Sequence, residues 1–306
     1  KTEGSPVSAS PPSPAIRPAM SFHYVPGDKP EMLAKATLRE AGAVIVDLED
    51  AVALDAKTTA RETAAEWLSG QKPGPTALWV RLNPQPDLQS LDLAAVVQPG
   101  LSGVYLPKVS SPSEVESVAT QLDTLEARGG IEPGSIRIAP LLETAAGILA
   151  APHIAASPRV SHLAIGEADL AADLGMHPSP DGRELNPIRT AIVVASAAAG
   201  LNPPIGPVET NFRDLESLRT TSGELRRMGY GGRAAIHPDQ IPVINAAFAP
   251  TVEELEAARN LLDRFESAQS EGRAVTVADD GSLIDEAVVR RARITLASQN
   301  PGNTER

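Results

Sequence analysis

The sequence has 306 residues, of which 42% are hydrophobic and only 3% aromatic, so it can bury a large core of aliphatic side chains. Its formal net charge of -12 argues against nucleic-acid binding, which needs a basic face, and no apolar run approaches the roughly 18 residues that span a membrane. The absence of cysteine excludes disulfides and thiolate metal sites, and it suits a cytoplasmic location.

Residues 1–19 are rich in Pro, Ser and Ala and contain no apolar segment of the kind that a secretory signal requires. We expect a flexible N-terminal arm there. From residue 20 to residue 249, short apolar runs alternate with amphipathic stretches, and this part is expected to form one domain.

Eight apolar runs in this domain are typical of buried strands. They cover residues 22–25, 43–46, 76–80, 103–106, 136–142, 160–165, 204–208 and 234–236. The seventh is the weakest because it contains prolines, which cannot donate to a strand ladder.

Helical stretches lie between the runs and include residues 31–41, 113–128, 189–199 and 215–228. Ser113 and Glu116 have the spacing of a capping box that opens a helix. Alternating strands and helices predict a parallel sheet, and eight such units predict an α/β protein with a (β/α)₈ TIM barrel. A doubly wound sheet is the alternative, although no glycine-rich dinucleotide fingerprint follows the first strand.

Residues 250–306 exceed what a barrel needs and form a predicted C-terminal extension. Thr251 can cap a helix over residues 251–266, and Glu253 and Glu254 in its first turn favour that helix. The segment from Gly281 to Asp285 leads into a last helix over residues 286–297. We expect this extension to pack on a neighbouring subunit.

Two acids, Glu143 and Asp169, directly follow the fifth and sixth predicted strands. Carboxyl ends of barrel strands carry active sites, so the two carboxylates are expected to hold one Mg²⁺, or Mn²⁺ in its place, with positions left for water and substrate. Each acid alone also has a structural explanation. Glu143 can belong to the first turn of a helix, and Asp169 can be an N-cap.

Other polar residues recur at the predicted strand ends, among them Asp47, Glu49, Asp50, Asn83, Lys108 and Glu167. Arg81 has the planar fork that grips a carboxylate, and Lys108 and Asp47 are further candidates for substrate contact. A structural salt bridge with Asp47, Glu49 or Asp50 explains Arg81 equally well. For His237 we favour a buried imidazole bonded to backbone.

A Mg²⁺ ion held by these acids would place positive charge beside a carbonyl of the substrate. Such an arrangement indicates an enzyme that makes or breaks carbon–carbon bonds through an enolate.

Seven segments, in order along the chain, resemble the citrate lyase β-subunit-like proteins of the HpcH/HpaI aldolase superfamily, which includes malyl-CoA and citramalyl-CoA lyases. The segments are residues 24–30 (YVPGDKP), 46–50 (VDLED), 81–83 (RLN), 106–108 (LPK), 143–147 (ETAAG), 166–175 (GEADLAADLG) and 236–241 (IHPDQI). The resemblance implies a Mg²⁺-dependent barrel that cleaves or forms β-hydroxyacyl-CoA thioesters, as a homotrimer or hexamer.

The resemblance also implies roles for individual residues. Glu143 and Asp169 match the metal ligands, Glu49 and Asp50 match acids that hold metal-bound waters, and Arg81 matches the residue that binds the acid or thioester oxygen. Asp285 matches an aspartate that acts as general acid or base in a neighbouring subunit, although an N-cap on the last helix would also explain it.

Three functions remain open at this point. The first is a Mg²⁺-dependent lyase or Claisen-type enzyme on an acyl-CoA, with thioester hydrolysis as a close variant. The second is a class II aldolase that acts on free 2-keto acids without CoA. The third is a non-catalytic subunit of a larger complex, which the joint presence of Glu143, Asp169, Arg81 and Asp285 argues against because a scaffold needs none of them.

Overall fold

A computed structural model describes residues 20–179, 181–270, 272, 275–278 and 281–298, so the arm expected over residues 1–19 lies outside the described residues. Eight parallel strands form a closed barrel in chain order, and the last strand pairs with the first. This confirms the predicted (β/α)₈ barrel. The strands are β1 Ser21–Pro26, β2 Ala43–Asp47, β3 Ala77–Arg81, β4 Gly103–Leu106, β5 Arg137–Leu142, β6 Ala164–Ile165, β7 Ile205–Gly206 and β8 Gly232–Ala235.

Two strands are much shorter than their apolar runs predicted. Before β6, Val160 makes only an isolated bridge to Ile138, and the ladder resumes at Ala164. The strand β7 is reduced to two residues, since prolines flank it and remove backbone donors.

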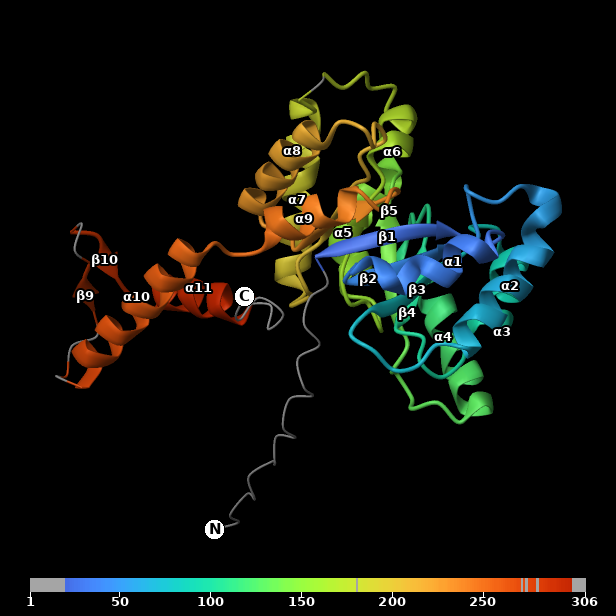
Figure 1. Cartoon of the computed structure of the whole chain (residues 1–306), viewed down its shortest axis with the longest axis horizontal. Helices are drawn as coiled ribbons and strands as arrows, with labels where there is room; N and C mark the ends of the chain where they lie inside the picture. Colours follow the sequence, from blue (N-terminus) through green and yellow to red (C-terminus); the bar gives the residue numbers. More distant parts are fainter. Residues whose placement is uncertain (1–19, 180, 271, 273–274, 279–280, 299–306) are drawn as a thin grey trace, which may run out of the picture.

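Helices surround the barrel (Figure 1). Within the described residues, no helix is both long and apolar enough to cross a membrane. The helices of the barrel are α1 Pro30–Ala36, α2 Lys57–Ser69, α3 Pro86–Val96, α4 Pro112–Gly129, α5 Ala145–Ala155, α6 Glu167–Asp173, α7 Asn186–Ala198, α8 Leu215–Met228 and α9 Gln240–Phe248, with short 3₁₀ turns at Thr37–Arg39, Leu54–Ala56 and Arg183–Leu185.

The end of one helix and the start of another differ from the predictions. The helix predicted over residues 31–41 ends earlier, because Glu40 adopts a left-handed conformation (φ 57°) that no helix continues through. The N-cap of α4 is Ser111, and the predicted capping box of Ser113 and Glu116 is not formed. Ser111 Oγ donates to Glu114 Oε1 at 3.0 Å, since Pro112 occupies the first helical position.

The core has two parts. Aliphatic side chains fill the space between the strands and the outer helices, whereas aromatic rings gather inside the barrel. Gly103 lies against Trp79 there, and an added Cβ would come within 2.3 Å of the indole. The inner cluster comprises Phe22, Ala43, Ile45, Trp79, Tyr105, Ala139, Leu141, Ala164 and Ile205, with Tyr24 and Ala77 packed against it. This cluster closes the barrel from below and leaves a hollow at the carboxyl ends of the strands.

The C-terminal extension projects from the barrel (Figure 1). It consists of α10 Val252–Ser270, β9 Thr276–Val277, β10 Leu283–Ile284 and α11 Glu286–Ala297. Its own small core contains Phe265, Ile284 and Val289. Thr251 caps α10 as predicted, since its Oγ1 accepts the Glu254 N–H at 3.2 Å. Packing on a neighbouring subunit stays a prediction for this single chain.

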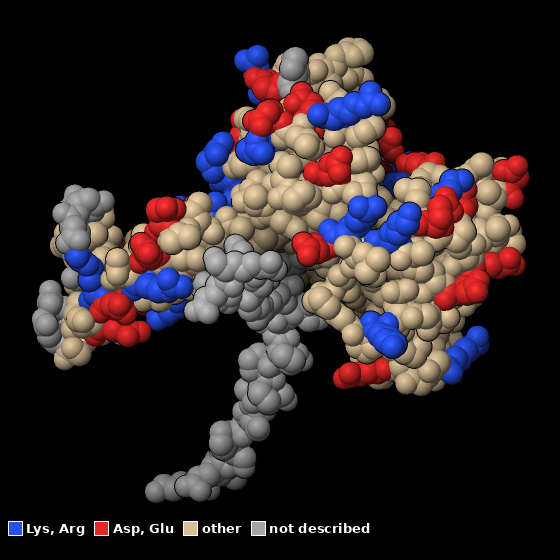
Figure 2. Space-filling view, in the orientation of Figure 1, with Lys and Arg blue, Asp and Glu red and all other residues tan. Residues whose placement is uncertain are grey.

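Charged side chains are mixed over the surface. Among the described residues on the face shown in Figure 2, acidic and basic side chains are interspersed without a broad basic area.

Candidate active site

A cavity of about 400 Å³ opens at the carboxyl ends of the strands, where the barrel fold places active sites. Its polar lining comes from the ends of β2, β3, β5 and β6, and includes Asp47, Asp50, Arg81, Glu143 and Asp169. Its apolar lining includes Tyr105, Leu141, Ala164, Ile205, Val208, Ala234 and Ile236. The cavity can therefore take a small molecule that has both charged and aliphatic parts.

Arg81, the last residue of β3, is tied to three carboxylates. Its Nε and Nη2 donate to the two oxygens of Asp47 at 2.7 and 2.6 Å, and Nη1 donates to Asp50 at 3.2 Å. Nη1 also lies 2.8 Å from Glu49 Oε2. Burial alone would lower the pKa of Arg81, but the hydrogen bonds to Asp47 raise it. The predicted salt bridge is confirmed with all three acids.

The loop after β2 is held in place by side-chain bonds to its backbone. Asp47 accepts the N–H groups of Glu49 (2.9 Å) and Ala51 (3.0 Å). Lys57 donates from Nζ to the carbonyl oxygens of Leu48 (2.7 Å) and Glu49 (2.6 Å). The sequence pattern did not indicate this role of Lys57, because the residue lies in a helix and not at a strand end. The Glu49 side chain is buried, and burial raises the pKa of its carboxyl.

Glu143 directly follows β5 and lies outside the following helix. Thr144 is the N-cap of α5, with its Oγ1 accepting the Gly147 N–H at 3.0 Å, so the explanation of Glu143 as a first-turn residue is wrong. Glu143 is only 3% exposed and accepts the backbone N–H of Lys108 at 2.9 Å. A Cβ on Gly166 would come within 2.4 Å of Glu143 Oε2 and 2.9 Å of Glu143 Cβ, so any side chain there would displace this carboxylate.

The raised pKa of Glu143 indicates that the nearby positive charges do not balance the nearby negative charges. Burial, followed by the charges of Glu49 and Asp169, raises the pKa of Glu143 to about 7. A bound cation would reverse this shift.

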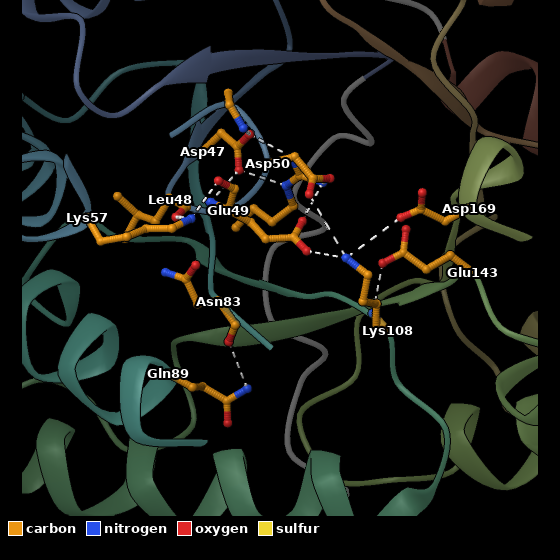
Figure 3. A network of polar contacts seen from close by, with 12 residues as sticks. Asp47, Leu48, Glu49, Asp50, Lys57, Asn83, Gln89, Lys108, Glu143 and Asp169 are labelled. Carbon is orange, nitrogen blue, oxygen red and sulfur yellow. Dashed lines mark hydrogen bonds and ion pairs between the residues drawn. The ribbon is translucent and has the colours of Figure 1, made fainter. Parts of the chain in front are cut away.

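Asp169 is the third residue of α6, whose N-cap is Gly166, so the explanation of Asp169 as an N-cap is also wrong. Its side chain is 47% exposed, and Oδ2 lies 3.7 Å from Lys108 Nζ. Figure 3 shows the carboxylates of Glu143 and Asp169 next to one another, both turned toward the Lys108 amine. The two acids that the sequence singled out therefore meet at one place.

The ammonium group of Lys108 lies among the carboxylates of the site. Its Nζ lies 2.5 Å from Glu49 Oε1 and 4.0 Å from Asp50 Oδ1, and its backbone is in the left-handed region at φ 55°. Such a conformation is costly for a residue with a Cβ and persists at functional sites.

The residues at the cavity suit a hard divalent cation. Five carboxylates (Asp47, Glu49, Asp50, Glu143 and Asp169) face two cationic side chains (Arg81 and Lys108), which leaves a formal excess of three negative charges (5 − 2). Within the part of the chain that the structure describes, no group of three or more His, Asp or Glu side chains is arranged to hold an ion. An ion held by Glu143 and Asp169 therefore needs further ligands from water or substrate.

Other residues named from the sequence lie at the edge of the site or outside it. His237 is 38% exposed, so the expected buried imidazole is wrong, although its Nδ1 does accept the Asp239 N–H at 3.2 Å. Asn83 is bonded to Asp92 at 2.8 Å and has a structural role. Glu167 lines the cavity, but its carboxylate is paired with Arg189.

Asp285 is the N-cap of α11, as its structural explanation predicted. Its Oδ1 accepts the N–H groups of Ala287 and Val288, each at 3.0 Å. It does not line the cavity described for this chain, so its role in a neighbouring subunit stays a prediction.

Comparison with known proteins assigns the family. Residues 20–238 match the model of the HpcH/HpaI aldolase/citrate lyase family. The chain is 35% identical over 281 residues to a (3S)-malyl-CoA thioesterase of Cereibacter sphaeroides, covering 92% of this chain and 94% of that protein. It is 32% identical over 279 residues to the citrate lyase subunit beta of Leuconostoc mesenteroides subsp. cremoris, covering 90% and 92%.

A solved structure supports the same assignment. The protein CitE from Mycobacterium tuberculosis, in complex with magnesium, acetoacetate and coenzyme A, superposes with a TM-score of 0.76 at 29% identity. The match covers 92% of this chain and 99% of that chain. The barrel with its acidic strand ends thus belongs to an enzyme of the HpcH/HpaI aldolase/citrate lyase family.

Proposed function

We propose that this protein is a Mg²⁺-dependent enzyme that makes or breaks a carbon–carbon bond in a β-hydroxyacyl-CoA of the malyl-CoA or citramalyl-CoA type. The observation that carries the proposal is the meeting of Glu143 and Asp169 beside Lys108 at the mouth of the barrel. Relatives named for malyl-CoA and citrate chemistry, and a neighbour crystallised with magnesium and coenzyme A, support it.

Glu143 and Asp169 are the residues that would hold the ion. Both offer the oxygen ligands that Mg²⁺ prefers, and the excess of negative charge around them favours a divalent cation. Bound there, the ion would supply positive charge next to a carbonyl that becomes an enolate. Mn²⁺ has similar ligand preferences and is a second candidate.

Arg81 is proposed to bind an oxygen of the substrate. Its three hydrogen bonds to Asp47 and Asp50 use three of the five N–H groups of a guanidinium, and Nη1 also faces Glu49 Oε2 at 2.8 Å, which leaves one N–H of Nη2 for a ligand. Because Asp47 holds the fork at two points, this remaining donor is oriented before the substrate arrives, and a preorganised donor stabilises developing negative charge. Glu49 and Asp50 complete the acidic wall beside it and are proposed to hold water on the ion.

Asp285 is proposed to enter the cavity from the extension of a neighbouring copy and to act as general acid or base. Both of its capping bonds end on Oδ1, and Oδ2 accepts no hydrogen bond from the described residues. The extension also projects from its own barrel, which suits a contact in a trimer or hexamer.

Hydrolysis of the thioester is a second candidate activity, and a specific observation favours it. The relative that is 35% identical over 92% of this chain is a (3S)-malyl-CoA thioesterase. Water that traps the same acyl group would give the free acid and CoA. An aldolase that acts on free 2-keto acids would use no CoA. Binding of CoA would therefore distinguish the lyase and the thioesterase from such an aldolase.

The test is to incubate the purified protein with malyl-CoA, citramalyl-CoA and hydroxymethylglutaryl-CoA, with and without Mg²⁺, and to identify the products by mass spectrometry. Acetyl-CoA with an oxo acid (glyoxylate from malyl-CoA, pyruvate from citramalyl-CoA or acetoacetate from hydroxymethylglutaryl-CoA) indicates a lyase, whereas free CoA with a hydroxy acid indicates a thioesterase. The proposal is wrong if no thioester is turned over and a free keto-acid aldol is.

A further inference from the structure

Tyr24 is a cavity residue that the metal site and Arg81 do not account for. It lies near the end of β1, where strand alternation directs Phe22 and Tyr24 to the inside of the barrel. It lines the cavity together with Arg81, Glu143 and Asp169. This alternation was the signal by which the sequence alone could have identified it.

The ring of Tyr24 is fixed on two sides. The Arg81 guanidinium lies over it, 5.0 Å from the ring centroid, and Tyr105 meets it edge-on at 6.3 Å between centroids. A cation over the ring face and an edge-to-face aromatic contact both restrict the orientation of a side chain. The direction of the hydroxyl is therefore set by the protein before any ligand binds.

The hydroxyl of Tyr24 differs from those of the other two tyrosines of the chain. Tyr105 shares a hydrogen bond of 2.9 Å with His162 Nε2, and Tyr230 donates to the carbonyl oxygen of Arg189 at 3.3 Å. The Tyr24 hydroxyl has no hydrogen bond to any described residue, although its ring is half-buried. A tyrosine hydroxyl that is taken out of water usually finds a partner, so that of Tyr24 is available to a ligand.

The hydroxyl is also a donor over the whole physiological range. Burial raises the pKa of Tyr24 above its ordinary value, and although the charge of Arg81 opposes this shift, the acids around it add to the rise. The group thus keeps its proton next to a cavity that is otherwise rich in acceptor carboxylates.

We propose that the Tyr24 hydroxyl donates a hydrogen bond to an oxygen of the acyl substrate, beside the oxygen held by Arg81. This inference rests on the proposed function, because it takes the cavity as the acyl site. It makes Tyr24 a further substrate-binding residue, one that selects an acyl group with an acceptor oxygen above the aromatic floor of the cavity.

The experiment compares Tyr24→Phe with the wild type. Phenylalanine keeps the ring contacts to Arg81 and Tyr105 and removes only the hydroxyl. Tyr230→Phe is the matched control, because it removes a tyrosine hydroxyl outside the cavity. Two quantities are measured in Mg²⁺ for each variant: the dissociation constant for acetoacetate by calorimetry, and kcat and KM for the thioester that the wild type turns over.

We expect Tyr24→Phe to weaken acetoacetate binding and lower kcat/KM by about tenfold or more, as for the loss of a hydrogen bond to a charged partner, with an unchanged Tm. Tyr230→Phe should match the wild type in both quantities. Values within twofold of the wild type for Tyr24→Phe would overturn the inference.

The two proposals can fail separately. If the wild type binds acetoacetate and Tyr24→Phe binds it tenfold more weakly, but no thioester is turned over, the proposed reaction is wrong and the role of Tyr24 stands. If the wild type binds neither acetoacetate nor a thioester, both are overturned.

Discussion

The two sides of the acidic cavity are built differently. On the side of β2 and β3, the charged side chains are held by several hydrogen bonds: Arg81 is bonded twice to Asp47, and Lys57 holds the backbone of the loop. On the side of β5 and β6, Glu143 accepts one backbone N–H, and Asp169 only approaches Lys108 at 3.7 Å. The paired side acts as a rigid scaffold, whereas the unpaired side has free oxygens to offer a cation.

Because of this contrast, we expect substitutions on the two sides of the cavity to have different effects. Loss of a carboxylate on the unpaired side should remove activity without lowering the stability, whereas changes on the paired side should lower the stability as well. A result in which both sides behave alike would contradict the distinction.

The largest effect is expected for Asp169→Asn. The substitution removes one of the two proposed protein ligands, so turnover in Mg²⁺ should fall by about three orders of magnitude, and Mg²⁺ binding by calorimetry should be lost. The exposed position predicts an unchanged Tm without metal. Asp173→Asn is the matched control, because Asp173 lies in the same helix but bonds the Ala145 N–H. Equal Mg²⁺ affinity in Asp169→Asn and wild type would exclude Asp169 as a ligand.

The next largest effect is expected for Arg81→Met on the paired side. It leaves the buried carboxylate of Asp47 without its guanidinium partner and Glu49 with Lys108 alone, and removal of one partner of a buried pair typically costs about 3–5 kcal/mol. Urea unfolding should show this loss of free energy. A variant as stable as the wild type would show that the paired side does not stabilise the fold.

Stability without metal should depend on pH through Glu143. Its pKa is raised to about 7 from an ordinary 4.5, so between these values the folded protein keeps a proton that the unfolded chain has released. Stability therefore falls as pH rises from about 4.5 to 7, by up to about 3 kcal/mol at 1.36 kcal/mol per unit. Glu143→Gln should remove this component, as measured by urea unfolding at pH 5 and pH 8 without metal. Parallel pH profiles for variant and wild type would contradict the shift.

Asp285→Asn tests whether the extension completes the unpaired side. Asparagine still caps a helix, so the fold should persist, while turnover falls about 100-fold for the loss of a general acid or base. A mixture of Asp285→Asn and Asp169→Asn chains, unfolded and refolded together, should regain activity, because some sites then combine intact residues from two copies. Unchanged turnover in Asp285→Asn alone would remove the residue from the mechanism.

The smallest effect is expected for Lys108→Met. Its ammonium lies among the acids that are proposed to attract the ion, so its removal should tighten Mg²⁺ binding by roughly threefold to tenfold, as for one partly exposed charge at this range. Calorimetric titration measures the change. Weaker Mg²⁺ binding would show that Lys108 orders the site more than it repels the ion.

The amino-acid sequence by itself determined the barrel and the order of its strands, because the apolar runs and the intervening amphipathic stretches recur with the spacing of β/α units. It also identified Glu143 and Asp169 as candidate site residues, because each follows an apolar run that predicts a strand. The length of β6 and β7 was not visible in that pattern, because pairing partners and flanking prolines decide how far a ladder continues.

Only the tertiary structure decided how the polar residues share the site. It pairs Arg81 with Asp47 and leaves Asp169 half-exposed, and it places Tyr24 in the lining of the cavity, where its hydroxyl has no hydrogen bond to a described residue. It also shows that a side chain on Gly166 would collide with Glu143. Such relations depend on distances between strands that are far apart in the chain, and closure of the barrel is what brings those strand ends to one place.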